Sequence, residues 1–594
     1  MPKIRIPPDK SIEVRSERKS IPYDTNNSST AKFNLEETKH TKDSLVTTTN
    51  MVEHMTKNVP GFAQDKHRDE ATKLGEYIGT NEMKRDREPE RNQNDDEVFS
   101  GIDDCLDNEG PESIRRLIER PDKPKRFSPR IYKNSRSDGD HPTPKGMHHQ
   151  HDNGTRKLAH PLSDFPESIE YLLTKETEIH EPPCRFEVSN EAAMENWKIL
   201  KRHNFNIESV SARSKRSAMM TGSEFKSTHD LERLLGAHPR WKKFKSILDR
   251  GVNFELEKLE EDLRQKDLDA AYHRGNHKSA KRNEKFLSDA MIKEIMQGWS
   301  LILPGDRYRE IPELVLNPMG VATHLGVTST GEFLPKNRVT HDLSFPGKFS
   351  GQSVNSRLKR TSLEPCMFSY VLLRTIHYIV SLREKFPDRR IWIRKEDFKS
   401  AFRRLHLNNI TALRSAVRVK LNELYYILIS LRQPFGGAPC PSEFAVIADV
   451  ITDTINDLLE CKQWDHNTLY SDLADKVPAE KQLDDDIPYQ QARKMSVRNT
   501  ATDYGKADVY VDDIITIAVD KGENLGRITR APITVMHAVA DRTSYKNTSI
   551  KRKDIVADDK MAAEGAAEEQ KICLGWLLNT RELLVKLPTH KAIA

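Results

Sequence analysis

The chain has 594 residues, of which 36% are hydrophobic and 31% are charged. Globular domains contain about 45–50% apolar and about 25% charged residues, so part of this chain is predicted to be too polar to bury a core. The formal net charge of +5 is too small over this length to indicate a polyanion partner by itself. No apolar run approaches the roughly 20 residues of a membrane span, and residues 1–10 lack the apolar core of a signal peptide. We therefore expect a soluble intracellular protein, cytoplasmic or nuclear, without a membrane partner.

Residues 1–183 are polar and charged, with frequent Pro and little hydrophobic periodicity, which predicts a disordered tail. The tail contains His148, His149 and His151, but three histidines in a flexible segment lack the fixed geometry of a metal site. The six cysteines of the chain have no C-x-x-C spacing, so neither a zinc site nor a disulfide framework is predicted.

Residues 184–300 have the spacing of amphipathic helices, with leucines recurring at intervals of roughly three and four. This α-helical lead-in carries two basic clusters, 240–245 and 273–282, in which cations stand beside aromatic or small polar residues. Such clusters bind nucleic-acid phosphates in some proteins and are solvated helix faces in others. Both interpretations remain open for each cluster.

After Pro304 the sequence changes to short β-rich runs separated by Pro and Gly, which predicts a strand–turn–strand unit. An amphipathic helix is predicted over 370–382 and a short strand over 390–394. Asp397 follows this strand closely, where its carboxylate is well placed to hold a divalent ion at the edge of a sheet.

A second candidate site lies in residues 508–519, where two β-rich arms flank Asp512 and Asp513. Turn aspartates commonly satisfy local backbone groups, and this explains one of them. It explains an adjacent pair poorly, because two neighbouring anions repel each other unless a cation neutralises them. Carboxylates from separate segments can hold the two metal ions that catalyse phosphoryl transfer.

These residues resemble the motifs of reverse transcriptases. Residues 510–513 resemble the Y-x-D-D box, Asp397 is similar to the first catalytic aspartate of that family, and residues 433–444 resemble its P-F-G…A-P…F segment. The resemblance, which covers 302–587, is to retroelement enzymes of the LTR or DIRS-like type. It implies that Asp397, Asp512 and Asp513 are catalytic and hold two Mg²⁺ or Mn²⁺ ions.

The same resemblance implies roles for further residues. Lys336 and Arg338, followed by Asp342, would bind the incoming triphosphate, and Phe402 would exclude the 2′-hydroxyl of a ribonucleotide. The other substrate-binding residues would be Gln433, Pro434, Phe435, Gly436, Gly437 and Tyr510, and the primer contacts Leu574, Gly575 and Trp576. The alternatives are an exposed hairpin for Lys336 and Arg338, a core position for Phe402, and a plain β-hairpin for residues 571–588.

Two departures from the family pattern are visible. Ser344 stands where a second Arg is usual, and a charged insertion occupies about 461–506. The insertion includes Asp484, Asp485 and Asp486, which are expected to be solvated because acidic runs usually are.

The predicted fold class is α+β, a right-hand polymerase core of fingers and palm over 301–594 with an antiparallel palm sheet. The α-helical extension 184–300 and the disordered tail precede it. The expected partners are an RNA or DNA template with its primer and deoxynucleoside triphosphates, and an RNase H or integrase would belong to a separate subunit. Three alternatives stay open: a truncated, inactive remnant that only binds nucleic acid or proteins, an interaction protein that recruits partners through its polar tail, and an RNA polymerase.

Overall fold

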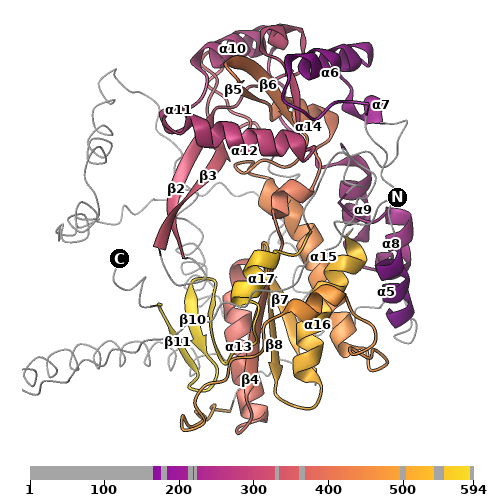
Figure 1. The fold of residues 1–594 in the computed structure, drawn as a ribbon, viewed down its shortest axis with the longest axis vertical. Helices are drawn as coiled ribbons and strands as arrows, with labels where there is room; N and C mark the ends of the chain where they lie inside the picture. The colour runs from indigo at the N-terminus through magenta and orange to yellow at the C-terminus, as the bar shows by residue number, and fades with distance from the viewer. Residues whose placement is uncertain are drawn as a thin grey trace, which may run out of the picture. The chain divides into compact units, whose positions relative to one another are not determined.

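The computed structural model describes residues 165–175, 183–211, 219, 224–327, 333–359, 368–494, 504–540 and 554–588. All of them belong to one compact unit, Ala63–Ala594. Most of the expected tail, including His148, His149 and His151, lies outside the described residues. Figure 1 shows the elements with the labels that are used below.

The described residues contain α-helices along their whole length. In chain order these are α5 (Phe165–Thr174), α6 (Asn190–Arg202), α7 (Ile207–Ser211), α8 (Thr228–Leu235), α9 (Trp241–Arg250), α10 (Glu261–Arg274), α11 (Lys278–Arg282), α12 (Glu284–Met296), α13 (Val371–Lys385), α14 (Asn409–Arg414), α15 (Cys440–Glu460), α16 (Asn524–Val539) and α17 (Asp558–Glu564). Short 3₁₀ helices are η4 (Gly305–Glu310), η6 (Phe368–Tyr370), η7 (Ala401–Arg404) and η8 (Asp472–Lys476).

The strands form four antiparallel sheets. They are β1 (Ser300–Pro304), β2 (Met319–Val327), β3 (Phe333–His341), β4 (Ile391–Asp397), β5 (Val417–Leu421), β6 (Leu424–Ser430), β7 (Lys506–Tyr510), β8 (Asp513–Val519), β9 (Gln570–Cys573), β10 (Trp576–Asn579) and β11 (Leu584–Lys586). The strand orders are β1-β6-β5, β2-β3, β4-β8-β7 and β11-β10-β9. The fold is therefore mixed helix and sheet, as the sequence predicts.

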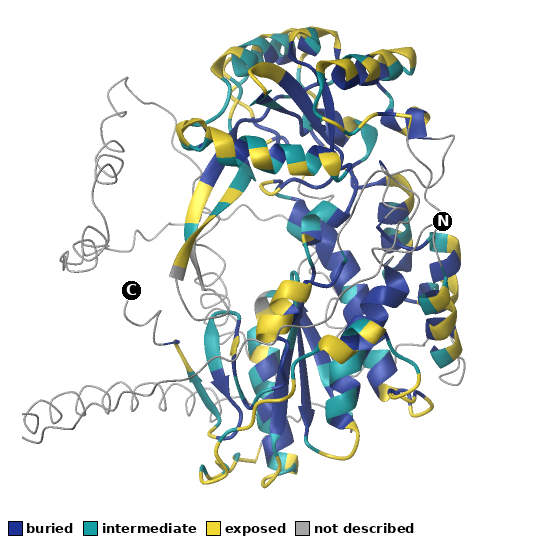
Figure 2. Cartoon of the chain, viewed as in Figure 1, coloured by how far each residue is buried: buried dark blue, intermediate teal, exposed yellow. Residues whose placement is uncertain are grey.

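The sheet β4-β8-β7 is covered on both faces. Because side chains alternate along a strand, Ile393 and Ile517 lie on one face and pack with α13 and the β9–β11 hairpins. Trp392 and Ile514 lie on the other face, in the large core that also contains the apolar residues of α15 and α16. Figure 2 shows these strands buried between their helices. The end of the sheet at which β4 stops is thus held between two packed layers.

The sheet β1-β6-β5 forms a second centre of packing. Ile302 and Leu428 of this sheet pack with Leu287 and Met291 of α12, and Val321 of β2 joins the same cluster. Neighbouring residues of β1 and β6 face the opposite way and belong to the large core. The two-stranded β2–β3 hairpin therefore extends from a firmly packed base (Figure 1).

Helix α5 corrects the predicted boundary of the tail. The prediction of a disordered tail includes residues 165–174, but Phe165, Ile169 and Leu172 are buried against the large core. Their spacing of four and three residues gives one apolar helix face, which contacts α8 and α16. For these ten residues the prediction of disorder is wrong, because a short apolar pattern is hard to recognise in polar surroundings.

The insertion is more closely packed than a solvated loop. Trp464 and Ser471 are buried, and η8 contacts α16. The side chains of Asp484, Asp485 and Asp486 are exposed or nearly so, as expected, but Arg581 donates to the backbone carbonyls of Asp484 and Ile487. The insertion is therefore anchored to the β10–β11 segment through its backbone.

No helix within the described ranges has both the length and the apolar character needed to cross a bilayer.

Candidate functional site

The three predicted catalytic aspartates come together at one end of the β4-β8-β7 sheet. Asp397 is the last residue of β4 and lies opposite Asp513, the first residue of β8. Asp513 is also paired with Tyr510 of β7, so that Val511 and Asp512 form the turn between β7 and β8. The backbone N–H of Phe398 donates to the carbonyl of Asp512 at 3.0 Å, which ties this turn to the end of β4. We call Asp397, Asp512 and Asp513 the carboxylate edge.

The turn that carries Asp512 has an unusual backbone. Val511 has a φ of 57°, in the left-handed region that β-branched residues rarely adopt. Such a conformation costs about 1–3 kcal/mol and persists only when its surroundings impose it. Here the two flanking strands impose it, and strain of this kind is characteristic of functional sites.

The three carboxylates of the carboxylate edge differ in their pKa values. Burial, and then the hydrogen bond and charge of Asp397, raise the pKa of Asp513 to about 8. Burial and the charge of Asp397 also raise the pKa of Asp512. Burial opposes ionisation of Asp397 too, but the hydrogen bond from Asp513 and the charge of Lys560 leave its pKa below the usual value. Burial and the charge of Asp397 therefore both disfavour ionisation of Asp512 and Asp513.

Two lysines that no sequence motif indicates lie at this edge. Lys560 of α17 donates to Oδ1 of Asp397 at 2.8 Å. Lys395, two residues before Asp397 on the same face of β4, is bound to Glu564 of α17 at 3.1 Å; burial would lower its pKa, but the charges of Asp513 and Glu564 outweigh burial and raise it. Nothing in the local sequence indicates Lys560, because its partner is 163 residues away.

Lys336 and Arg338 lie on one exposed face of the β2–β3 hairpin. They are two residues apart on β3, opposite His324 and Ala322 of β2, while Val339 of the other face packs on the core. Arg338 is close enough to the turn to act against the raised pKa of Asp512 by its charge. Of this predicted basic pair, Arg338 thus acts on the carboxylate edge through its charge.

Asp342 forms hydrogen bonds within the protein. Its carboxylate accepts from Nε2 of His277 at 3.0 Å and from the backbone N–H of Ser344 at 3.1 Å. The hydrogen bond with His277 lowers the pKa of Asp342. Ser344, which replaces the usual Arg, accepts a hydrogen bond from Asn355. Asp342 therefore joins the lead-in to the hairpin, and its contact with substrate stays a prediction.

The two glycines of the Gln433–Gly437 turn are required by neighbouring protein atoms. Gly436 has a φ of 132°, and a Cβ there would lie 1.9 Å from the carbonyl oxygen of His341. A Cβ on Gly437 would lie 2.7 Å from Sγ of Cys440. The close approach at Gly436 is that of the end of β3, and contact of these two glycines with substrate stays a prediction.

Gln433 and Phe402 lie beside this turn. The side chain of Gln433 is fully buried, and neither its amide nitrogen nor its amide oxygen has a hydrogen-bond partner in the part of the chain that the structure describes. The carbonyl of Pro434 accepts from the thiol of Cys440 at 3.3 Å. The ring of Phe402 is partly buried, 6.4 Å from that of Phe435, which is 45% exposed. The structure thus gives Phe402 both a core contact and an exposed neighbour.

The predicted primer-contacting residues form the turn between β9 and β10. Leu574 and Gly575 have φ values of 51° and 82°, as a two-residue hairpin turn of the primed type requires. Leu574 and Trp576 pack on the cluster that contains α13 and one face of the carboxylate-bearing sheet. Tyr510 packs on that cluster as well and lies edge-on to Phe368.

The first basic cluster of the lead-in is used within the protein. Its cations bind acidic residues of α15 that we call the α15 cluster; the pairs are Lys243 with Glu443 at 3.0 Å, Arg240 with Asp449 at 2.6 Å, and His238, just before the basic run, with Asp453 at 3.0 Å. Trp241 and Phe244 are buried in the core. These contacts favour the structural interpretation of residues 240–245.

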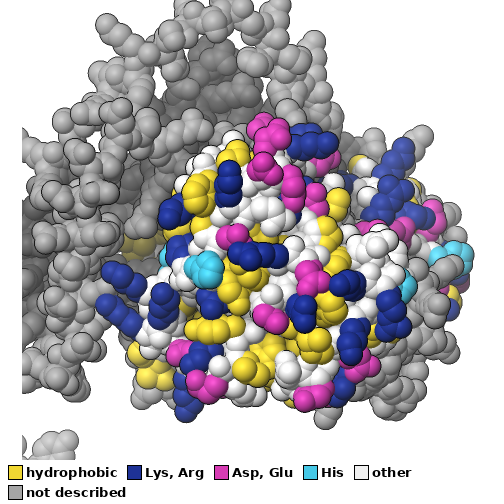
Figure 3. All heavy atoms as spheres, turned by 90° about the horizontal axis from the view of Figure 1, so that it is seen from above, with side chains coloured by type: hydrophobic (Ala, Val, Ile, Leu, Met, Phe, Trp, Pro, Cys, Tyr) yellow, Lys and Arg dark blue, Asp and Glu magenta, His cyan; other side chains and the backbone are white. Residues whose placement is uncertain are grey.

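The second basic cluster is divided between structural contacts and solvent. Arg274 lies 3.6 Å from the ring centre of Phe345, and His277 binds Asp342, whereas Lys278 and Lys281 are exposed. Acidic and basic side chains are interspersed on the face seen in Figure 3, and ion pairs such as Lys201 with Glu310 occur on the nearby helices. The lead-in therefore presents no surface of uniform positive charge there.

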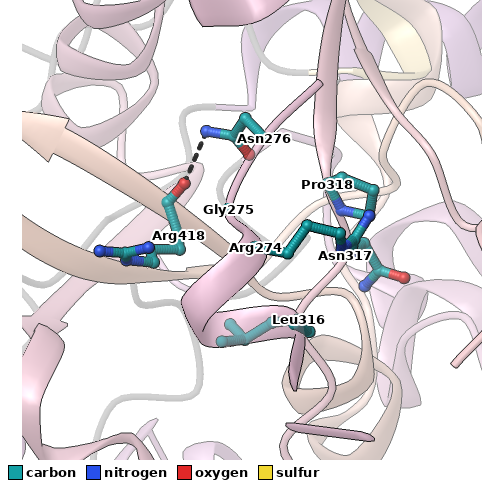
Figure 4. A pocket seen from close by; sticks show the side chains of 8 residues that line it. Arg274, Gly275, Asn276, Leu316, Asn317, Pro318 and Arg418 are labelled. Atoms are coloured by element: carbon teal, nitrogen blue, oxygen red, sulfur yellow. Dashed lines mark hydrogen bonds between the residues drawn. The ribbon is translucent and has the colours of Figure 1, made fainter. Parts of the chain in front are cut away.

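A small recess lies where the lead-in meets β5 (Figure 4). It is lined by Ala271, Arg274, Gly275, Asn276, Leu316, Asn317, Pro318 and Arg418. Asn276 donates to the carbonyl of Arg418 at 2.9 Å and accepts from the backbone N–H of Met319. The recess contains none of the predicted site residues, and its polar groups serve to join neighbouring segments.

The carboxylate edge suits a divalent cation in its chemistry. Carboxylate oxygens are the ligands that Mg²⁺ and Mn²⁺ prefer, and a bound cation would favour ionisation of Asp512 and Asp513, whose pKa values are raised first by burial and then by Asp397. Within the described residues, however, no group of three or more His, Cys, Asp or Glu side chains is arranged to hold a metal ion. Binding of a metal here would thus require side chains of the edge to move.

No protein-family model and no curated protein matches the chain. Similar solved structures include a foamy viral protease-reverse transcriptase in complex with double-stranded DNA (TM-score 0.27, 13% identity, 58% of this chain and 39% of that chain) and the native prototype foamy virus protease-reverse transcriptase (0.26, 14%, 53% and 28%). Another is apo telomerase from Candida tropicalis truncated from its C-terminal domain (0.23, 11%, 74% and 98%). The chain spans less than half the length of the foamy viral chains, and likeness at these TM-scores carries no argument about activity or substrate.

Proposed function

We propose that this chain is an RNA-directed DNA polymerase of the retroelement type, which adds deoxynucleotides to the 3′ end of a primer. The observation that carries the proposal is the carboxylate edge, in which Asp397 and Asp513 face each other across two antiparallel strands with Asp512 in the adjoining turn. In this proposal the β4-β8-β7 sheet is the palm and the β2–β3 hairpin belongs to the fingers.

Asp397 and Asp512 would hold two Mg²⁺ or Mn²⁺ ions, with Asp513 supporting them. When bound, such ions lower the pKa of the attacking 3′-hydroxyl and stabilise the charge of the leaving pyrophosphate. Strands β4 and β8 fix the backbone positions from which these carboxylates extend. Because the pKa of Asp513 is raised to about 8, its action as a ligand would require loss of its proton at neutral pH.

Lys336 and Arg338 would neutralise the triphosphate of the incoming nucleotide. Both lie on the same solvent-facing side of β3, and Arg338 already acts on Asp512 through its charge. Cations placed where phosphate charge grows stabilise the transition state more than the ground state. The buried amide of Gln433, which has no hydrogen-bond partner among the described residues, would contact the nucleotide or the template.

Phe402 would select deoxynucleotides by filling the space below the sugar, and the β9–β10 turn at Leu574, Gly575 and Trp576 would contact the primer. Replacing Phe402 with Ala tests the first role. Increased incorporation of ribonucleotides is expected, whereas an RNA polymerase would keep its choice of sugar.

The deciding experiment is primer extension on poly(rA)/oligo(dT) with dTTP and Mg²⁺ or Mn²⁺, comparing the full chain with Asp512→Asn. Extension by the full chain that the substitution abolishes is the expected result. Folded chain that extends no primer with either metal would contradict the proposal.

A second candidate function is nucleic-acid binding without chemistry. The contact of Lys560 with Asp397 favours it, because an ammonium already occupies one oxygen of a carboxylate that catalysis would need. Under this candidate the unaltered chain and its Asp512→Asn variant would bind the primer–template equally well, and neither would extend it.

A further inference from the structure

Helix α17 and the residues before it follow the end of β4 closely. The backbone N–H of Ala557 donates to the carbonyl of Asp397 at 3.0 Å, and that of Lys399 donates to the carbonyl of Ile555 at 2.7 Å. Phe398 and Val556 form an antiparallel bridge between these two hydrogen bonds. The short segment ahead of α17 thus pairs with the chain at the point where β4 reaches Asp397, and it fixes where the helix begins.

Three lysines then hold α17 over β4 and the residues after it through ion pairs. Two of them belong to the β4 segment and bind carboxylates of α17, namely Lys395 with Glu564 and Lys399 with Asp558 and Asp559. With the third lysine the charges are reversed, because Lys560 of α17 binds Asp397. Lys560 is therefore the lysine of this contact whose partner, Asp397, belongs to the carboxylate edge.

The two partners of the ion pair between Lys560 and Asp397 differ sharply in exposure. The side chain of Asp397 is 4% exposed and that of Lys560 is 55% exposed. Lys560 thus reaches from solvent to a buried carboxylate. Its ammonium can return to solvent at a small cost in free energy, because the side chain is flexible and already half exposed. Asp397 has no such freedom, because its backbone is fixed in β4.

Charge links Lys560 to the whole edge. Asp397, Asp512 and Asp513 all act on Lys560 through their charge, and Asp397 acts most strongly. An ammonium hydrogen-bonded to Oδ1 occupies the direction from which a divalent ion would approach the same oxygen. Two cations a few ångströms apart repel each other, so Asp397 cannot hold both fully.

We propose that Lys560 is a built-in competitor of the divalent metal, which neutralises Asp397 in the metal-free protein and is displaced from it when metal binds. This inference rests on the proposed function, since it takes Asp397 as a metal ligand. Lys395 and Lys399 of the β4 segment form their ion pairs with carboxylates of α17, so neither of them is paired with a carboxylate of the edge. Metal affinity is then set in part by a residue that never touches the metal.

The test is a titration of the full-length chain with Mn²⁺ alone, followed by the electron paramagnetic resonance signal of the free ion. Lys560→Gln removes the ammonium and keeps a polar side chain, so Mn²⁺ is expected to bind about 3- to 10-fold more tightly, as for loss of a half-exposed charge-assisted contact. Lys560→Arg keeps the charge and is expected to bind Mn²⁺ within about twofold of the unaltered chain.

The matched control is Lys399→Gln, which removes other ion pairs of α17 without touching the carboxylate edge. Its Mn²⁺ affinity is expected to be unchanged within about twofold, because charge lost away from the ligands is screened. An equal gain in the Lys560 and Lys399 variants would mean that loosening α17, rather than removing a competitor, exposes the metal site, and would overturn the proposal. Unchanged or weaker binding by Lys560→Gln would overturn it as well.

Asp512→Asn separates this inference from the proposed function. Binding of Mn²⁺ that Asp512→Asn abolishes, together with no gain in Lys560→Gln, rejects the competitor and keeps the metal site. Lack of any Asp512-dependent binding in both the unaltered chain and Lys560→Gln rejects the metal site itself. Far-ultraviolet circular dichroism and thermal unfolding of each variant establish that the compared proteins are folded.

Discussion

The α15 cluster and the carboxylate edge are both sets of largely buried acidic side chains, but their charge is balanced in different ways. In the α15 cluster each carboxylate has a partner of its own from the segment around α9, namely Lys243, Arg240 or His238. At the carboxylate edge Asp397 and Asp513 face each other, and the ammonium of Lys560 donates to Asp397. Paired charges hold two elements together, whereas opposed like charges leave a demand for a cation.

The two regions also differ in what their acids do to each other. Burial raises the pKa of Asp449 to about 6, although Arg240 lies beside it and opposes the change. Burial together with Asp397 raises the pKa of Asp513 to about 8. Burial alone therefore does not identify a functional site, because Asp449 and Asp513 are both largely buried. A carboxylate that lies against another carboxylate is a better indication of one.

The largest expected effect is on activity at the carboxylate edge. Asp512→Asn should lower the rate of primer extension by about 10³-fold or more, because it removes a ligand charge from the reacting centre. Steady-state extension of oligo(dT) on poly(rA) measures it. The matched substitution Asp449→Asn, in the α15 cluster, should leave the rate per folded molecule within about threefold, because the charge it removes is remote from the reacting centre. A similar loss in both variants would remove the distinction between the two regions.

The next effect is on stability and its pH dependence. The pKa of Asp513 is about 8 in the folded chain and about 3.9 in an unfolded one, so between these pH values the unfolded state loses a proton that the folded state keeps. Stability therefore falls as pH rises from about 4 to about 8. Asp513→Asn removes this loss while keeping a donor for Asp397, and should raise the free energy of unfolding by about 3 kcal/mol at pH 8.

Urea unfolding with EDTA present, at about pH 5 and about pH 8, tests this. The gain in Asp513→Asn should be much smaller at the lower pH, because ionisation of Asp513 then stabilises the unfolded chain much less. Equal gains at the two pH values would show that the raised pKa of Asp513 is not the cause.

Breaking an ion pair of the α15 cluster should lower the free energy of unfolding, and by less than Asp513→Asn raises it. Arg240→Gln leaves Asp449 without its ion pair in a largely buried place and should lower the free energy of unfolding by about 2 kcal/mol. Because the folded pKa of Asp449 would rise further above its unfolded value, the loss should grow as pH rises from about 5 to about 8. Thermal unfolding at both pH values measures it, and a pH-independent loss would argue against the role given to Asp449.

The smallest effect concerns backbone strain, which Val511 carries at the carboxylate edge. Val511→Gly relieves a β-branched side chain at positive φ and should stabilise the chain by about 1 kcal/mol after the entropy cost of glycine. Val511→Ala, which keeps a Cβ, should gain less. Differential scanning calorimetry of both variants measures the order, and a destabilised glycine variant would show that the side chain of Val511 contributes more by packing than it costs by strain.

The sequence alone determined the local parts of this protein. The pattern around residues 390–397 predicts the buried strand that becomes β4, and the helix expected over 370–382 is α13. Two β-rich arms around Asp512 and Asp513 predict the β7–β8 hairpin. These predictions succeed because period and turn chemistry depend on neighbouring residues, and they already placed two of the three aspartates at one turn.

Only the tertiary structure decided which distant groups meet. Lys560 reaches Asp397 from 163 residues away, and Arg240 reaches Asp449 from 209 residues away. Gly436 needs its freedom because the carbonyl of His341 lies against it. None of these contacts leaves a local pattern, because the free energy of an ion pair or a close approach depends on distance in space, and the folding of the intervening chain sets that distance.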